Sequence, residues 1–355
     1  MTTALTGMDY KFAQRGNWGG RIHFDQDAGA QWRGACASEG RSYAEILADS
    51  DAIVQVDISS SYPYAMLNAY PKGEHTAVTD PVAAEEAYRA GKHGMFSVSF
   101  IVPANLKRGV LPIRGKTKMS WPTAAGTVGE GVFTEVDLRL AEQKGYQWSF
   151  TGEALVWAES STTLFADFVT KLTALKVQYE EDKPVRKVLK NITTRLYGKL
   201  GQKVSGSQTN NYKVISTETA EELLFSGDKD KIESMREDGG QWWLRSMGKK
   251  NTHPNHLGSY VLSYSRVHLH RLMDLIDYDN HFVSTDALRV SVAQYLQLQA
   301  AGWIDPVAIG KLKVERLILA YAQTNVNDYE VLELLPSGER VVVLKGKSSN
   351  RRVHL

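Results

Sequence analysis

Two short apolar stretches that each carry an aspartate stand out in the hydrophobic pattern of this chain. Residues 54–63 read VQVDISSSYP, which predicts a short buried strand with Val54 and Val56 on one face, ending at Asp57 before a serine-rich turn. Residues 281–290 read HFVSTDALRV and predict a second strand that breaks at a turn carrying Asp286. Two strand-borne carboxylates that meet are the minimum for holding a divalent metal ion, so we predict that Asp57 and Asp286 form such a pair.

The rest of the pattern alternates between helices, strands and polar stretches. Residues 203–255 are polar and rich in glycine and serine, which indicates an insertion, while residues 345–355 are basic and 314–321 are amphipathic. Periodicity and capping residues predict helices over 80–90, 134–144, 162–180, 184–198, 259–276 and 291–302, with a strand over 95–102 and a hairpin over 329–345.

The helix expected over 184–198 has two chemically different faces. Aliphatic side chains form a packing face, whereas Arg186, Lys190 and Tyr197 project from another face at helical spacings. Two cations one turn apart beside an aromatic ring suit a triphosphate and a stacked base. This helix is therefore predicted to bind a nucleotide.

Two further segments have compositions that suit nucleic acid. Residues 15–22 read RGNWGGRI, in which Gly19 and Gly20 before Arg21 let the backbone approach a phosphate chain, with a simple glycine turn as the alternative. Residues 107–118 are basic and rich in loop formers, and they either follow a nucleic-acid backbone or form a solvated loop.

Composition narrows the class of protein only slightly. The 355 residues have 43% hydrophobic side chains and a net charge of +2, which predicts a globular protein and leaves the partner open. The single cysteine, Cys36, excludes an internal disulfide and a multi-cysteine zinc site. No apolar run of 18 residues and no signal-peptide pattern occur, so we expect a soluble, cytoplasmic protein with no membrane partner.

Three motifs in a fixed order resemble motifs A, B and C of the family B DNA polymerases. DISSSYP at 57–63, KNITTRLYGK at 190–199 and VSTDA at 283–287 resemble the family patterns DxxSLYP, KxxxNSxYG and YxDTDS. The spacings and the GGR at 19–21 look most like the protein-primed branch of phages and linear plasmids. The similarity covers roughly residues 10–325.

The resemblance implies an α+β fold, with a polymerase palm of antiparallel strands backed by helices, helical fingers, inserted subdomains and little or no thumb. The implied division of the chain is a template-contacting segment at 1–50, palm at 51–102 (motif A), an inserted subdomain at 103–160, fingers at 161–202 (motif B), a second insertion at 203–255, palm at 256–320 (motif C) and a reduced thumb-like segment at 321–355.

The resemblance also implies a function for individual residues. Asp57 and Asp286 would be catalytic and bind two Mg²⁺ ions, with Mn²⁺ as a substitute. The residues implied to bind the nucleotide are Arg186, Lys190, Tyr62, Tyr197 and Ser60, and those implied to bind DNA are Gly19, Gly20, Arg21, Thr285 and Tyr321.

This chain departs from the family patterns at several positions. Ser284 replaces the first aspartate of motif C, Ala287 its serine and Phe282 its tyrosine, while Thr194 and Arg195 replace Asn-Ser in motif B. The loss of one carboxylate weakens the local negative potential, so we expect slower turnover or an altered metal preference.

The expected activity is template-dependent DNA synthesis by a DNA-directed DNA polymerase that uses a DNA template-primer and dNTPs. Priming by a protein is implied only by the resemblance to the protein-primed branch. Only 56 residues precede Asp57, so we expect no 3′–5′ exonuclease domain on this chain. A terminal priming protein and a separate exonuclease or thumb subunit are the implied partners.

Two alternatives remain open at this point. The first is a catalytically weakened palm that acts as a nucleic-acid-binding or assembly subunit, which Ser284 and the altered motif B favour. The second is a small-molecule nucleotidyltransferase, which the basic segments at 107–118 and 345–352 count against.

Overall fold

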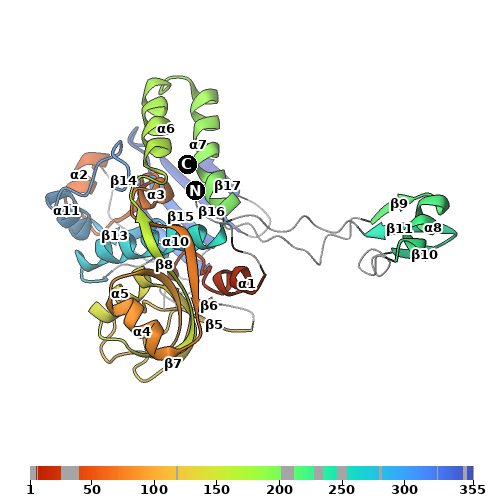
Figure 1. Ribbon diagram of the computed structural model, residues 1–355. Helices are drawn as coiled ribbons and strands as arrows, with labels where there is room; N and C mark the ends of the chain where they lie inside the picture. Colours follow the sequence, from red (N-terminus) through yellow and green to blue (C-terminus); the bar gives the residue numbers. More distant parts are fainter. Residues whose placement is uncertain are drawn as a thin grey trace.

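A large antiparallel sheet, one long helix behind it and a helix pair standing above it organise the molecule in the computed structural model (Figure 1). A second, smaller sheet with its own helices lies below the long helix. The structure describes residues 5, 7–24, 40–116, 119–200, 212–227, 235–245, 254–279, 282–325, 327–346 and 350–354. The mixture of helices with antiparallel sheets agrees with the predicted α+β class.

The large sheet brings together strands that are distant in sequence. Its strands follow the spatial order β1 (Ile22–Phe24), β12 (Phe282–Ser284), β13 (Ala287–Ser291), β2 (Ile53–Ile58), β14 (Leu312–Asn325), β15 (Asp328–Leu334), β16 (Arg340–Lys345) and β17 (Asn350–His354). All neighbouring pairs are antiparallel. The two strands expected to carry Asp57 and Asp286 are thus direct neighbours through β13 and β2.

Alternation along β2 explains why the sheet buries one face. Val54, Val56 and Ile58 are buried in a cluster with the long helix α10 (Asn255–Asp274), as the valine pattern predicted. Helices α2 (Tyr43–Ala48) and α11 (Val292–Ala300) contribute to the same cluster. Each fully buried aliphatic side chain stabilises this packing by about 1.5–3 kcal/mol. The opposite face of β2 carries Ile53 and Gln55, which are also buried, and then the half-buried Asp57.

The C-terminal third of the chain extends the large sheet. The amphipathic segment at 314–321 lies within the strand β14, and the expected hairpin at 329–345 is formed by β15 and β16. The basic end of the chain adds β17, which pairs with β16.

The smaller sheet has an aromatic core of its own. Its strands follow the order β3 (Tyr70–Val78), β8 (Gln147–Ser161), β4 (His93–Ile101) and β7 (Val128–Thr134), and its helices are α4 (Pro81–Arg89) and α5 (Glu135–Gln143). Phe96, Phe100 and Phe133 are fully buried between these elements. A short hairpin, β5 (Ile113–Arg114) and β6 (Met119–Ser120), lies at its edge.

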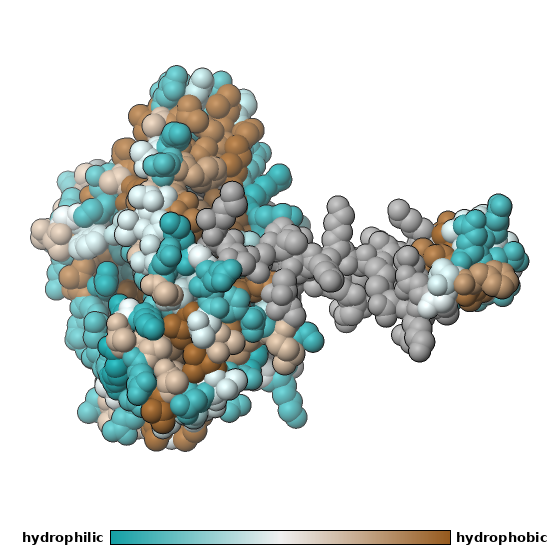
Figure 2. Space-filling model, viewed as in Figure 1, coloured by the Kyte–Doolittle hydropathy of each residue, from teal (hydrophilic) through white to brown (hydrophobic). Residues whose placement is uncertain are grey.

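The helix pair consists of α6 (Ala166–Gln178) and α7 (Lys183–Leu200), with the short helix α3 (Ser61–Ala65) near its base. Along α6, Leu172 is buried, but Phe168 is 37% exposed. Figure 2 shows hydrophobic residues across this lobe, and Val177 and Val188 are among the exposed ones. The pair therefore packs at its base and keeps apolar residues on its surface.

Helix α1 and a small module lie outside the two main sheets. Helix α1 (Gly7–Arg15) packs beside the long helix α10. The described part of the polar stretch at 203–255 forms a small module that Figure 1 draws apart from the rest, with β9 (Tyr212–Ile215), α8 (Thr217–Phe225), β10 (Met235–Asp238) and β11 (Gln241–Arg245).

A buried ion pair joins the two main sheets through their helices. The Arg266 guanidinium of α10 donates from Nη2 to Asp137 Oδ2 of α5 at 2.7 Å, and from Nε to Oδ1 at 3.2 Å. Both side chains are 4% exposed. Arg266 Nη1 also donates to the carbonyl oxygens of Trp18 and Gly19, at 3.0 and 3.3 Å. One side chain thus links α10, α5 and the segment at residues 15–22 that contains Gly19 and Gly20, which we call the glycine segment.

We expect that Arg266→Met lowers the free energy of unfolding by about 3–5 kcal/mol, because it leaves the buried Asp137 carboxylate without its cationic partner. The matched control is Arg271→Met on the same helix, where the side chain is exposed and the change should stay within about 0.5 kcal/mol. Urea unfolding followed by tryptophan fluorescence measures both variants. Equal stabilities of the two variants would contradict this account of how the two sheets are joined.

Candidate functional site

Strand register places Ser284, Asp57 and Lys313 in one row, the polar row, across the face of the large sheet, with Ala287 between the first two. Ser284 lies opposite Ala287, Ala287 opposite Asp57, and Asp57 opposite Lys313, on the four strands β12, β13, β2 and β14. Residues directly opposite each other on neighbouring strands share one face of the sheet. The row therefore lies on the face that the valines of β2 leave free.

Asp286 sits in the tight turn between β12 and β13. Thr285 has a φ of 62°, in the left-handed region, and the Asp286 N–H donates to the Ser284 carbonyl at 2.7 Å. The carbonyl of Asp286 in turn accepts from the N–H of Ile58 at 2.8 Å, which fixes the turn beside the end of β2. Asp57 and Asp286 both line the same two cavities, so the structure brings this expected pair together.

The surroundings of the pair make both negative charges costly. Burial raises the pKa of Asp57, although the ammonium of Lys313, 2.7 Å from Asp57 Oδ2, acts against the increase. Burial and the neighbouring charge of Asp57 raise the pKa of Asp286 to about 6. A cation at this place removes both penalties, because it neutralises the repulsion between the two carboxylates.

The carboxylates of Asp57 and Asp286 fit Mg²⁺, a hard cation that takes one or two protein carboxylates and keeps several waters. The Lys313 ammonium on Asp57 shows that a positive charge is already accommodated there. Within the part of the chain that the structure describes, no three His, Cys, Asp or Glu side chains are grouped to hold a metal ion. The site thus offers a pair of carboxylates.

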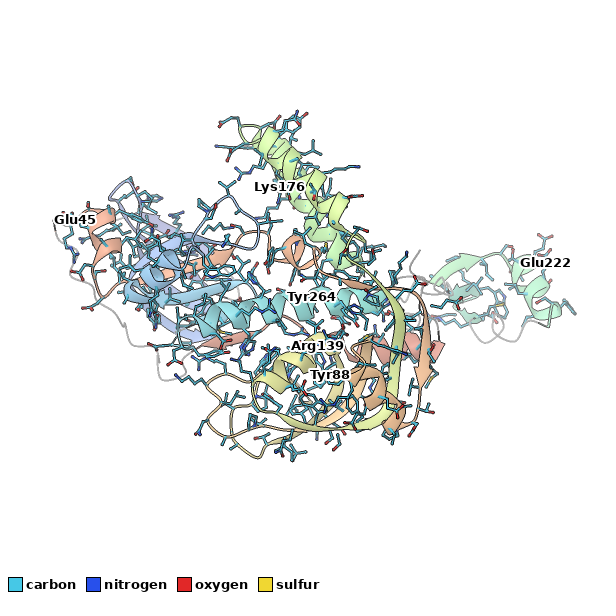
Figure 3. The ribbon with its side chains drawn as sticks, turned by 60° about the vertical axis from the view of Figure 1, so that its left-hand side comes forward. Glu45, Tyr88, Arg139, Lys176, Glu222 and Tyr264 are labelled. Carbon is cyan, nitrogen blue, oxygen red and sulfur yellow. The ribbon has the colours of Figure 1, made fainter. Side chains whose placement is uncertain are left out.

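A cavity of about 470 Å³ opens on one side of the pair and is lined by cations from the helix pair. Arg186 and Lys190 of α7 line it, as expected, and so does Lys176 of α6, which Figure 3 labels on the helix pair. Lys176 Nζ donates to Ser60 Oγ at 3.2 Å, and burial, then the charges of Lys190 and Arg186, lower the pKa of Lys176. Such a wall suits a triphosphate.

Lys176 and Lys313 were missed by the sequence reasoning. Lys176 lies near the end of α6, and it reaches the cavity because α6 and α7 are joined by a short turn and pack side by side. The sequence feature that could have revealed Lys176 is the short connection between the two helices, which places the end of the first helix opposite the start of the second. Lys313 depends on strand register, which the sequence does not state.

The aromatic residues of motifs A and B also meet. The rings of Tyr62 and Tyr197 lie 4.3 Å apart between centroids, and Tyr62 lines the cavity of about 470 Å³. Burial raises the pKa values of both phenols, so the hydroxyls stay protonated. Ser60, with a φ of 53°, lines the same cavity just before α3. All five residues expected to bind a nucleotide thus lie in or beside one cavity.

The residues expected to bind DNA are placed differently from one another. Gly19 is exposed, and the Thr285 N–H donates to the Arg21 carbonyl at 2.8 Å, so the glycine segment touches the turn that carries Asp286. Arg21 itself is 2% exposed and Tyr321 5% exposed. Contact of this segment with a template strand stays a prediction, and the buried side chain of Arg21 would not take part in it.

The buried side chain of Arg21 has internal partners. Its Nη1 donates to the Gly109 carbonyl and lies 2.6 Å from Nε2 of His270, while its guanidinium stacks over the Trp121 ring. Burial, then the charge of Arg108, lowers the pKa of Arg21 to about 9. Burial also lowers the pKa of His270, so its ring is neutral and accepts the hydrogen bond. Arg21 therefore anchors the glycine segment through buried contacts.

A second cavity, of about 380 Å³, opens on the other side of the carboxylate pair. Its walls include Ser284, Glu315 and Lys345 in addition to the two aspartates. The pair therefore separates a cation-lined cavity from a second one over the open face of the sheet.

Comparison with known proteins assigns the chain to a family. The family model described as DNA polymerase type B, organellar and viral, matches residues 34–238, more than half of the chain. The chain therefore belongs to this family of type B DNA polymerases, which confirms the family predicted from its three motifs. No curated protein sequence matches the chain.

Among solved structures, phi29 DNA polymerase has the same fold. The chain superimposes on its orthorhombic crystal form with a TM-score of 0.67, and on its complexes with primer-template DNA, without and with incoming nucleotides, with TM-scores of 0.66. In each case the identity is 14% and 99% of this chain is covered. The chain spans about half the length of these structures, 55–56%. Among the described residues, no helix is both long and apolar enough to cross a membrane.

Gly20 is in close contact with the turn that carries Asp286, and this generates a prediction. A Cβ on Gly20 would lie 2.6 Å from Oγ1 of Thr285, whereas one on Gly19 would meet only the tip of Met119, at 3.5 Å. Gly20→Ala should therefore cost about 1–3 kcal/mol of stability and Gly19→Ala less than about 0.5 kcal/mol. Thermal unfolding measures both; equal melting temperatures would show that the turn adjusts freely.

The raised pKa of Asp286 predicts a pH dependence in the metal-free protein. The folded state binds this proton with a pKa of about 6 and the unfolded state near about 3.9, so stability is present at low pH and falls as pH rises between these values. Asp286→Asn removes the charge and should stabilise the protein by about 1–2 kcal/mol at pH 7.5 and little at pH 4.5, allowing for solvent screening. Melting temperatures in EDTA, with the exposed Asp51→Asn as control, measure this. A gain that is independent of pH would contradict it.

Proposed function

We propose that this chain carries the nucleotidyl-transfer site of a DNA-directed DNA polymerase that copies a template from dNTPs. The observation that carries the proposal is the carboxylate pair, Asp57 and Asp286, beside a cavity walled by Lys176, Arg186 and Lys190. Membership of the type B DNA polymerase family supports it. So does the fold shared with phi29 DNA polymerase, which has been solved with primer-template DNA and incoming nucleotides.

The proposed reaction is an in-line substitution at phosphorus. The 3′ oxygen of the growing strand bonds to the α-phosphorus of the nucleotide, the bond to the β-phosphate oxygen breaks, and pyrophosphate leaves while the hydroxyl proton passes to water. Two Mg²⁺ ions, or Mn²⁺, held by Asp57 and Asp286 would lower the pKa of the 3′ hydroxyl and neutralise charge on the triphosphate.

The residues around the pair would position the nucleotide. Lys190 and Arg186 would bind the β- and γ-phosphates, with Lys176 beside them, because all three line the cavity. The cavity volume of about 470 Å³ is within the usual range for a small-molecule site. Tyr62, held by its contact with Tyr197, would pack under the sugar and exclude a 2′ hydroxyl. Ser60, which lines the same cavity, would contact the primer end. These positions supply orientation, which contributes much of the rate enhancement in such reactions.

The template and the primer are proposed partners. The exposed backbone at Gly19, with the half-buried Gly20 next to Thr285, would contact the template. Priming by a protein hydroxyl, through a separate terminal protein, follows the likeness to the phage branch. A free DNA 3′ end is the other primer to test.

Primer extension with Mg²⁺ or Mn²⁺ tests the proposal. Asp57→Asn and Asp286→Asn should each reduce extension by about 10²–10³-fold or more, because they remove charge that is needed in the transition state. Asp328→Asn, at the far end of β14 and β15, is the matched control and should extend as the wild type does. Residual extension equal to that of the control would refute the assigned pair.

One specific observation keeps a second function under test. Ser284 stands at the end of the polar row, where the family has an acid, and a weakened palm would bind nucleic acid without catalysis. Wild-type protein that shows no extension, yet binds primer-template equally well with and without Asp286→Ala, would favour this binding function.

A further inference from the structure

The Lys313 ammonium lies on the carboxylate that is expected to hold a divalent ion. Its Nζ is 2.7 Å from Asp57 Oδ2. Lys313 lies outside the three polymerase motifs, which cover residues 57–63, 190–199 and 283–287. An ammonium and a divalent ion that share one carboxylate are only a few atoms apart, and two positive charges at that distance repel each other strongly. Lys313 and the metal ion therefore compete for Asp57.

Strand pairing makes this contact a fixed feature of the fold. Lys313 lies directly opposite Asp57 in the antiparallel pair of β14 and β2. Residues opposite each other in such a pair project from one face with their Cβ atoms about 4.5–5.5 Å apart. The side chains of Lys313 and Asp57 are 38% and 19% exposed, so salt screens the pair less than it screens charges on the open surface.

The charge of Lys313 acts on both carboxylates. Burial raises the pKa values of Asp57 and Asp286, and the positive charge of Lys313 opposes the increase at each of them. On the other flank of Asp57, the polar row ends in the uncharged Ser284. Without a metal ion, Lys313 thus supplies part of the positive charge that a divalent ion would bring to the pair.

A triphosphate would offer Lys313 a second partner. Lys313 lines the cavity of about 470 Å³ together with Lys176, Arg186 and Lys190. Burial and the charges of Lys190 and Arg186 lower the pKa of Lys176, and the charge of Lys313 contributes to this decrease. The Lys313 ammonium therefore lies between the carboxylates and the cationic wall. Because lysine has a flexible four-carbon stem, rotation about its bonds is enough to exchange one partner for the other.

We propose that Lys313 is a displaceable internal cation, which holds Asp57 in the metal-free protein, competes there with the incoming divalent ion, and moves to the triphosphate once metal and nucleotide are bound. The inference rests on the proposed function, since it needs a metal ion on the carboxylate pair and a triphosphate in the adjoining cavity. Lys313 thereby couples the two ligands, because the metal ion removes its first partner and the nucleotide supplies the next.

Binding of Mn²⁺ to the full chain, measured from the free-ion signal in electron paramagnetic resonance, tests the competition without any turnover. Lys313→Met has a side chain of similar length but no charge, and it should bind Mn²⁺ about fivefold more tightly, as the loss of a partly exposed competing ion pair predicts. Lys313→Arg keeps the charge and should show no such gain.

The matched control removes the same charge two residues earlier. The Lys311 ammonium lies over the Trp303 ring and donates to the Gly302 carbonyl at 2.9 Å. Lys311→Met should therefore bind Mn²⁺ as the wild type does.

A nucleotide analogue with an imido group between its α- and β-phosphates tests the transfer. When this analogue is saturating, Lys313→Met should lose its advantage in Mn²⁺ affinity, because the wild-type lysine then pairs with the triphosphate. By reciprocity, Lys313→Met should bind the analogue about fivefold more weakly than the wild type does in Mn²⁺, and about equally well in EDTA.

Three results would overturn the proposal. Unchanged Mn²⁺ affinity in Lys313→Met would show that the lysine does not compete, and an equal gain in Lys313→Arg would show that its charge is not the cause. A gain in Lys313→Met that persists with the analogue bound would show that the lysine repels the metal ion but is not transferred.

Failure of the proposed function would look different from failure of this inference. If Asp57 and Asp286 are not the metal pair, Asp57→Asn leaves Mn²⁺ binding unchanged. If only the inference fails, Asp57→Asn abolishes Mn²⁺ binding and Lys313→Met binds the ion as the wild type does.

Discussion

Two half-buried carboxylates held against each other are the constraint on which the rest of this structure depends. Asp57 and Asp286 come from strands more than two hundred residues apart, and a backbone hydrogen bond from Ile58 to Asp286 fixes their relation. Burial and mutual repulsion make ionisation of the pair unfavourable, as the raised pKa of Asp286 records. Such an arrangement persists only if the packing elsewhere overcomes its cost, and a bound cation removes that cost.

The packing that holds the pair is concentrated in the long helix and its polar contacts. The valine face of β2 packs on α10, and Arg266 of the same helix clamps Asp137 and the carbonyls of the glycine segment. That segment in turn receives the Thr285 N–H next to Asp286. The smaller sheet, the glycine segment and the turn of motif C are therefore parts of one connected support.

The sequence predicted the parts of the site that local patterns encode. Asp57 at the end of an alternating strand, Asp286 in a turn, and Arg186 and Lys190 one turn apart on a helix all follow from periods of 2 and 3.6 residues. Lys313 and Glu315 could not be found in this way, because their places depend on the register of β14 and on the bulge within it. Arg21 shows the opposite failure, since a basic residue after two glycines suggested a surface contact and its guanidinium is buried.

The charges around the carboxylate pair suit both the metal-free site and the proposed site that holds a metal ion and a nucleotide. Without a metal ion, the Lys313 ammonium lies on Asp57, while Lys176, Lys190 and Arg186 line the adjoining cavity. Burial, and then the charges of Lys190 and Arg186, lower the pKa of Lys176, and the positive lining of the cavity suits an anion. Under the proposed function, a triphosphate arriving with a divalent cation would supply negative charge to the lysines and positive charge to the aspartates at once. Each group thereby meets an opposite charge, so metal and nucleotide should bind more favourably together than either does alone.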